Sequence, residues 1–231
     1  MYSTSACAPP PWDDSLGDVV CAILTQAIGH FATSGSVDAD PNLADDAFLL
    51  GGRAVTYCGR HIVARPALVA QMIDAAAAGC TCAHPDAGMS ACSLIRRICS
   101  SDELLKAGVL GMVLTPPRGP HALSRLMACV AGAVPRQRLE DAGDALMALY
   151  EAAGPPPRGS ALGGADWLVA TLQAVPDSVA GAADKSALAS ALASGPFMPT
   201  SIRAIGEFSD TCRRTKTFSD QAVHALLALG G

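Results

Sequence analysis

The chain has 231 residues, half of them apolar, and a formal net charge of −5 from 16 basic and 21 acidic residues. This acidic balance disfavours a protein that binds nucleic acid by broad charge neutralisation. Aromatic residues make up 4% of the chain and charged residues 16%. A core built from small aliphatic side chains favours closely packed helices over a broad sheet, and the low charge is typical of a surface that a partner partly covers.

The first third of the chain reads as helices separated by glycine and proline. Apolar residues recur with helical spacing from Leu16 to Phe31, which predicts a helix that stops at Gly35. An acidic loop follows at residues 34–46. Residues 47–63 are ambiguous, because they fit either a helix broken at two glycines or a short extended piece. Pro66 then suits the first turn of another helix.

The middle of the chain contains the clearest breaks. A cysteine-containing loop at residues 80–89 precedes Ser90, which we predict to cap the next helix. Ser100 and Glu103 have the spacing of a capping box. The sequence TPPRGP at 115–120 is a firm break, and Pro120 is predicted to open the helix that follows it.

The last third has the same character. The stretch GPPPRGSALGG at 154–164 reads as a linker. Further helices are predicted around residues 167–175, 179–192, 202–208 and 219–229, and Ser219 is the expected cap of the last one.

We therefore predict an all-α fold, a compact bundle of about nine or ten short helices with loops punctuated by proline and glycine, and we find no internal repeat of fixed period. The chain is predicted to be a single domain over 1–231, or two lobes at 12–114 and 120–231 separated by the 115–120 break. The absence of a long uninterrupted apolar run argues against a membrane span.

Cysteine and histidine crowd one region. Nine cysteines, an odd number, suit reduced thiols inside a cell. The spacings Cys58-x-x-His61 and Cys80-x-Cys82-x-His84, with Cys92 nearby, supply more thiolate and imidazole groups than the four ligands that zinc needs. We therefore expect no cofactor other than zinc, for which the candidate ligands are Cys58, His61, Cys80, Cys82, His84 and Cys92. The alternatives are separate buried thiols, which pack as small hydrophobes, or a redox pair.

Motifs for catalysis are missing. The sequence contains no G-x-S-x-G elbow, no phosphate-binding G-x-x-x-x-G-K-[ST] and no dinucleotide-binding G-x-G-x-x-G. A cysteine–histidine nucleophile pair has no local signature either. We expect no enzymatic activity.

The densest positive segment is CRRTK at 212–216. Arg213, Arg214 and Lys216 are the candidates for contacts with the phosphates of a nucleic acid. The alternative is a solvated turn between the last two helices.

A short stretch, HALSRLMACVAG at 121–132, resembles a helix of the all-helical nucleocapsid proteins of some negative-strand RNA viruses. Those proteins are basic and this chain is acidic, so the likeness identifies no family.

Taken together, these features favour a non-enzymatic helical structural or assembly protein that acts through protein partners or self-association, such as a subunit of a viral capsid or nucleocapsid or of another large complex. The alternative is a zinc-stabilised intracellular regulatory or host-interaction module built on the cysteine and histidine cluster at 58–92. We expect the protein in the cytoplasm or nucleus, or within an assembled virion.

Overall fold

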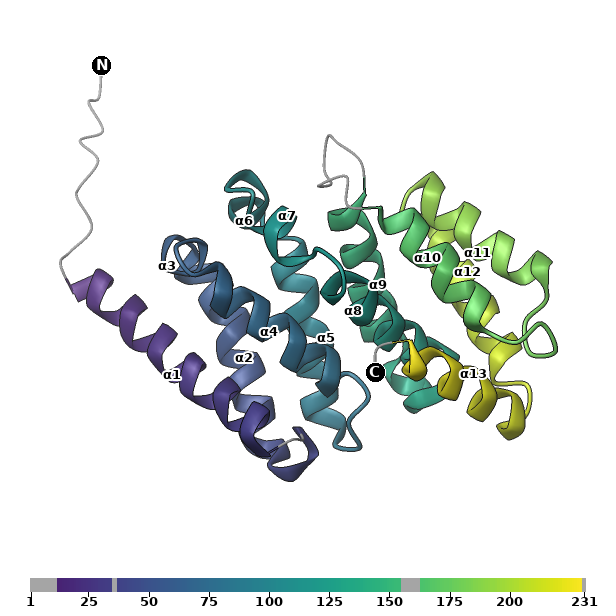
Figure 1. Ribbon diagram of the computed structural model, residues 1–231, viewed down its shortest axis with the longest axis horizontal. Coiled ribbons are helices and arrows are strands. Elements are labelled where there is room, and N and C mark those ends of the chain that lie inside the picture. Colours follow the sequence, from purple (N-terminus) through teal and green to yellow (C-terminus); the bar gives the residue numbers. More distant parts are fainter. Residues whose placement is uncertain (1–11, 35–36, 155–162, 230–231) are drawn as a thin grey trace, which may run out of the picture.

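The computed structural model describes residues 12–34, 37–154 and 163–229 (Figure 1). Its α-helices are α1 (Trp12–Ser34), α2 (Pro41–Tyr57), α3 (Gly59–Val63), α4 (Pro66–Gly79), α5 (Pro85–Cys99), α6 (Asp102–Lys106), α7 (Val109–Val113), α8 (Arg118–Ala128), α9 (Leu139–Ala153), α10 (Gly164–Ala174), α11 (Ala182–Ser194), α12 (Pro199–Cys212) and α13 (Lys216–Ala228). Shorter 3₁₀ or π segments are η1 (Val37–Ala39), η2 (Cys129–Ala133) and η3 (Arg136–Arg138).

The prediction of an all-α fold is confirmed, since these described ranges contain no strand. They hold thirteen α-helices, slightly more than expected. The excess comes from α3, α6 and α7, which have 5 residues each and lack a long periodic pattern of their own. None of the described helices is long and apolar enough to span a bilayer. The division of the chain into one domain or two lobes stays a prediction, and most of the expected linker at 154–164 lies outside the described residues.

The helices stack as successive antiparallel pairs in two layers (Figure 1). The first layer contains α1, α4, α8 and α10, each packed on the next, and the second contains α2, α5, α9 and α12. Contacts within the pairs α1–α2, α4–α5 and α8–α9 join the layers, and α13 turns back to pack on α8 and η2. Helix pairs stacked in this way form α-solenoids, in which each unit contacts mainly its neighbours.

Two glycines that made residues 47–63 ambiguous lie inside α2. Gly51 and Gly52 are buried, and the side chains of Leu94 and Arg97 from α5 lie where their Cβ atoms would be. The helix is therefore unbroken, and the glycines allow α2 and α5 to approach closely. Arg97 also donates from Nη1 to the Thr56 hydroxyl at 3.3 Å, which joins the two helices near their carboxyl ends.

Two helices begin earlier than their predicted caps. The N-cap of α5 is His84, whose Nδ1 accepts from the amide of Ala87 at 3.4 Å, and the N-cap of α13 is Thr215, whose hydroxyl accepts from the amide of Phe218. Ser90 consequently lies within α5, where its hydroxyl donates to Asp45 of α2 at 2.5 Å. Serine, histidine and threonine can all fill a cap position, so local spacing alone selected the wrong residue.

Arg138 stabilises the carboxyl end of α4. It lies just before α9, is buried, and donates from Nη2 to the carbonyl of Cys80 at 2.8 Å and from Nη1 to that of Cys82 at 3.1 Å. The last carbonyls of a helix have no partner within the helix, and a charged donor forms strong hydrogen bonds to them. Arg138 thereby fixes the second helix pair to the third.

Arg213 does the same for the end of α8 and η2. It follows α12 and donates to three carbonyls, from Nη2 to Cys129 at 2.7 Å, from Nη1 to Val134 at 2.9 Å and from Nε to Val130 at 3.2 Å. Gly132, with a φ of 133°, turns the chain beneath this guanidinium. The same device thus ties the third helix pair to the end of the array.

Gly88 tests the role of Arg138. A Cβ at this position would overlap the Arg138 guanidinium, so Gly88→Ala is expected to displace it and lower the free energy of unfolding by about 2 kcal/mol. Helix propensity alone predicts the opposite sign, a gain of about 1 kcal/mol. Urea unfolding followed by circular dichroism measures the change, and Gly206→Ala in α12, where a Cβ meets nothing within 4 Å, is the control that is expected to gain stability. Equal gains for both variants would contradict this role.

Candidate functional site

The structure divides the predicted metal ligands into two groups. Cys58 and His61 lie at α3 beside α1, where His61 Nδ1 is 3.4 Å from the carboxylate of Asp18. Cys80, Cys82, His84 and Cys92 lie at the far end of α4. That helix has 14 residues, a length of about 20 Å, so the two groups cannot share one ion.

The second group surrounds the Arg138 guanidinium. The thiol of Cys92 lies 3.6 Å from that of Cys80, and the Cys129 thiol donates to the Cys80 carbonyl at 3.3 Å. Cys82 donates in turn to the carbonyl of His84. Within the described ranges, no three or more His, Cys, Asp or Glu side chains are grouped so that they could hold a metal ion. Zinc binding stays a prediction.

The environment of Cys80 and Cys82 holds their thiols neutral. The pKa of Cys80 is raised mainly by its hydrogen bond with Cys92 and also by burial. Burial raises the pKa of Cys82, and it raises the pKa of Cys99 to about 12. A nucleophilic cysteine requires the opposite shift. The role of Arg138 was missed because the sequence does not show that this position, just before α9, is buried; only the fold does.

The predicted nucleic-acid contacts lie at the turn between α12 and α13. Arg213 is occupied by backbone carbonyls, as described above. The guanidinium of Arg214 lies 5.0 Å from the ring centre of Phe218, a cation–π arrangement, and Lys216 is exposed. Contact of these three residues with nucleic acid stays a prediction.

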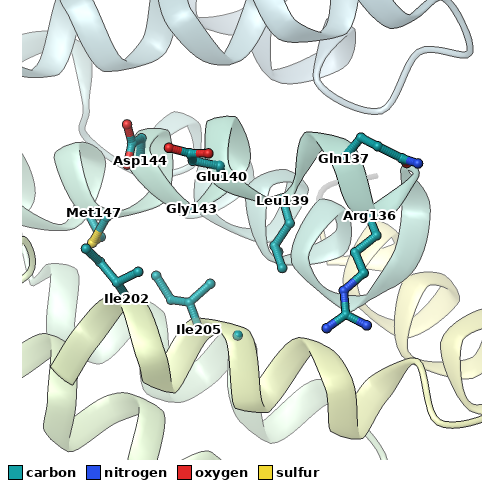
Figure 2. Close-up of a pocket in the computed structure, with 10 residues that line it drawn as sticks. Arg136, Gln137, Leu139, Glu140, Gly143, Asp144, Met147, Ile202 and Ile205 are labelled. Carbon is teal, nitrogen blue, oxygen red and sulfur yellow. The ribbon is translucent and has the colours of Figure 1, made fainter. Parts of the chain in front are cut away.

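A groove that the sequence did not reveal opens between α9 and α12 (Figure 2). Its volume is about 430 Å³, and its lining residues are Arg136, Gln137, Leu139, Glu140, Gly143, Asp144, Met147, Ile202, Ile205 and Gly206. Leu139 and Met147 of α9 face Ile202 and Ile205 of α12, which makes the floor apolar (Figure 2). Ile202 is 57% exposed, so its side chain is available for contact with a ligand.

Two glycines keep this groove open. A Cβ at Gly206 would meet nothing within 4 Å, and one at Gly143 would make ordinary contact with Ile205. In both cases the missing side chain leaves space between the helices. Glycine is unfavourable within a helix, and at these two positions its small size leaves room for the groove.

The rim of the groove is charged, with acidic groups on the α9 side. Asp144 lies 3.8 Å from Arg96 of α5 in a partly exposed pair, and Glu140 is exposed one turn earlier. Arg136 is paired with Asp210 of α12 at 2.6 Å. A ligand thus meets apolar side chains between the helices and carboxylates along one edge.

Comparison with known proteins gives one informative match. The chain is 27% identical over 199 residues to a protein of Arabidopsis thaliana named Transportin MOS14. The match covers 84% of this chain and 20% of that protein, so the chain spans about a fifth of the length of the relative it matches. No family model matches the chain, and no solved structure matches it.

This match corrects the function predicted from composition. The prediction of a viral capsid or nucleocapsid subunit, with a location in a virion, was wrong, because the relative is a transport protein of a plant. The alternative, a zinc-stabilised regulatory module, has no support from it. Low charge and apolar helices are shared by many proteins that bind other proteins, so composition could not separate an assembly subunit from a transport protein.

Thiol labelling tests the environment of the cysteines. Of the eight cysteines in the described ranges, Cys58 is half-buried and the others are buried. In a Cys7→Ser background, Ellman's reagent at neutral pH is expected to label Cys58 rapidly and the rest only on unfolding, because buried neutral thiols react slowly. Cys58→Ser should abolish the rapid phase. Rapid labelling of Cys80 or Cys92 would show that the second group is accessible.

Proposed function

We propose that this chain is a protein-binding part of a stacked-helix transport protein and that it binds a segment of a partner protein in the groove between α9 and α12. The observation that carries the proposal is the apolar lining of this open groove, in which the exposed Ile202 and the half-buried Leu139 lie beside the buried Met147 and Ile205. Concave surfaces of stacked helix pairs commonly bind extended partners.

The groove has the chemistry for a peptide segment rather than a small metabolite. It is open along one side and has apolar side chains along its floor, which suits the alternate anchors of an amphipathic segment. The exposed carboxylate of Glu140, with Asp144 beside it, favours a basic residue next to those anchors. The partner segment is therefore expected to combine large apolar residues with lysine or arginine.

The relative supports a role in transport. Its name, Transportin, describes a protein that carries others, and a receptor of that kind needs surfaces that take up segments of its cargo. Applied to this chain, the groove is one such surface. The expectation of protein partners in the cytoplasm or nucleus agrees with this role, whereas the expectation of a virion does not.

Gly206 offers a direct test. Gly206→Leu places a side chain at the open groove, where a Cβ meets nothing within 4 Å, and removes a helix-disfavouring glycine. Peptides selected from a displayed random library on the wild-type chain are expected to be rich in apolar and basic residues and to lose at least about tenfold in affinity for Gly206→Leu. Fluorescence anisotropy with labelled peptides measures the loss.

Gly29→Leu is the matched control. Gly29 is an exposed glycine in α1, and its Cβ also meets nothing within 4 Å. This variant is expected to bind the selected peptides as the wild type does. Equal binding by all three proteins would place the peptides elsewhere and refute the proposed site.

A further inference from the structure

Two thiols face each other inside the second helix pair. Cys80 is the C-cap of α4, Cys92 lies within α5, and their Sγ atoms are 3.6 Å apart. Both side chains are buried. The two sulfurs of a disulfide are about 2.05 Å apart, so these thiols need to approach each other by about 1.5 Å to form a bond.

The neighbouring cysteines are arranged differently. Cys129 donates to the carbonyl of Cys80 at 3.3 Å, and Cys82 donates to a backbone carbonyl two residues further along the chain. Cys99 lies seven residues after Cys92 on the same helix, where burial raises its pKa to about 12. Among the residues that the structure describes, Cys80 and Cys92 are the pair whose thiols form a hydrogen bond with each other.

The chain next to Cys80 is suited to the movement that a bond requires. Cys80 precedes a short loop, residues 81–84, in which Ala83 is exposed and Thr81 is partly exposed. Solvent-facing loops open locally at a lower free energy than packed helices do. We therefore expect an oxidant as small as hydrogen peroxide to reach the buried thiols when this loop opens.

The pair also lies beside a buried positive charge. Arg138 donates to the Cys80 carbonyl at 2.8 Å, and its described hydrogen-bond acceptors are backbone carbonyls rather than carboxylates. Peroxides react with the thiolate, which a nearby cation favours. The hydrogen bond with Cys92 and burial raise the pKa of Cys80, and the Arg138 charge opposes that rise. Oxidation is therefore expected to be slow and specific to this pair.

We propose that Cys80 and Cys92 are a dithiol that hydrogen peroxide oxidises to a disulfide within the folded chain. In the first step one thiol gives up its proton, its sulfur attacks a peroxide oxygen, and the O–O bond breaks to give a sulfenic acid and water. In the second step the other thiol sulfur attacks the sulfenic sulfur, the S–O bond breaks, and a second water leaves. Both sulfurs are oxidised and the peroxide is reduced. A reducing thiol reverses the bond by exchange.

The disulfide would join α4 to α5 at the point where Arg138 already joins α4 to α9. It closes the loop of residues 80–92, and cross-linking a loop of this length restricts the unfolded chain. Oxidation is thus expected to stabilise the second helix pair. This inference does not depend on the proposed function of the groove.

Mass spectrometry of the folded chain after treatment with hydrogen peroxide tests the pair. A Cys7→Ser/Cys58→Ser background removes the half-buried thiol of Cys58 and the thiol that lies outside the described residues. The chain is expected to become lighter by two hydrogen atoms, and dithiothreitol should restore its mass. Cleavage before aspartate separates the two cysteines into fragments 74–85 and 86–101, which should stay joined until they are reduced.

Matched variants identify the two sulfurs. Cys80→Ala and Cys92→Ala should each abolish the joined fragments. Cys82→Ala and Cys99→Ala remove other buried thiols from the same two fragments and should leave them joined. Circular dichroism checks that each variant remains folded.

Thermal unfolding shows whether the bond fits the native packing. The oxidised chain is expected to melt at least about 5 °C above the reduced chain, because the cross-link lowers the entropy of the unfolded state. Circular dichroism with and without dithiothreitol measures the difference.

Three results would overturn the inference. The first is a chain that is unchanged by peroxide or that gains oxygen atoms without losing hydrogen. The second is a pair of fragments that stays joined in either Cys80→Ala or Cys92→Ala. The third is an oxidised chain that melts at or below the temperature of the reduced chain, because the bond would then be incompatible with the packing of α4 on α5.

Discussion

The array depends on two guanidinium groups, one buried and one partly buried, that donate to the carbonyls at the ends of first-layer helices. Arg138 holds the end of α4 from the start of α9, and Arg213 holds the end of α8 and η2 from the end of α12. Each arginine joins one helix pair to the next, because its own helix belongs to the following unit. A charged donor forms strong, directional hydrogen bonds to carbonyl groups, so the two contacts position α9 against the end of α4 and α12 against the end of α8 and η2.

The second layer has a tighter junction between α2 and α5 and a more open one between α9 and α12. Between α2 and α5, buried glycines admit the side chains of the neighbouring helix, and the Ser90–Asp45 and Arg97–Thr56 contacts join the two helices, with a hollow of about 420 Å³ beside Thr56 and Arg97. Between α9 and α12, a Cβ at Gly206 would meet nothing within 4 Å, and Ile202 remains exposed. A glycine in this layer therefore either admits a side chain of the neighbouring helix or leaves an open space, depending on how close that helix lies. The open junction is where we place the partner segment.

The sequence predicted the helical class and most long helices because their apolar periodicity is local. The predicted helix starts at Ser90 and Ser219 were wrong. The N-caps are His84 and Thr215, and only the fold shows which side chain accepts from the first free amides of each helix. Cys80, Cys82 and Arg213 were candidate site residues from the sequence. In the structure the carbonyls of Cys80 and Cys82 accept from Arg138, and Arg213 donates to carbonyls at the end of α8 and η2. The groove escaped prediction because Leu139 and Ile202 are far apart in sequence. The stacking also escaped prediction, since the pairs that begin at Trp12, Pro66 and Arg118 show no repeat of fixed period in the sequence.

Hydrogen–deuterium exchange measured with and without a selected peptide tests the central claim, that partner segments bind between α9 and α12. We predict slower exchange in the first two turns of α9 and around Ile202–Gly206, with α1 and α4 unchanged. Protection confined to the first layer, or to the turn that contains Arg214 and Lys216, would contradict the account and place the binding surface elsewhere.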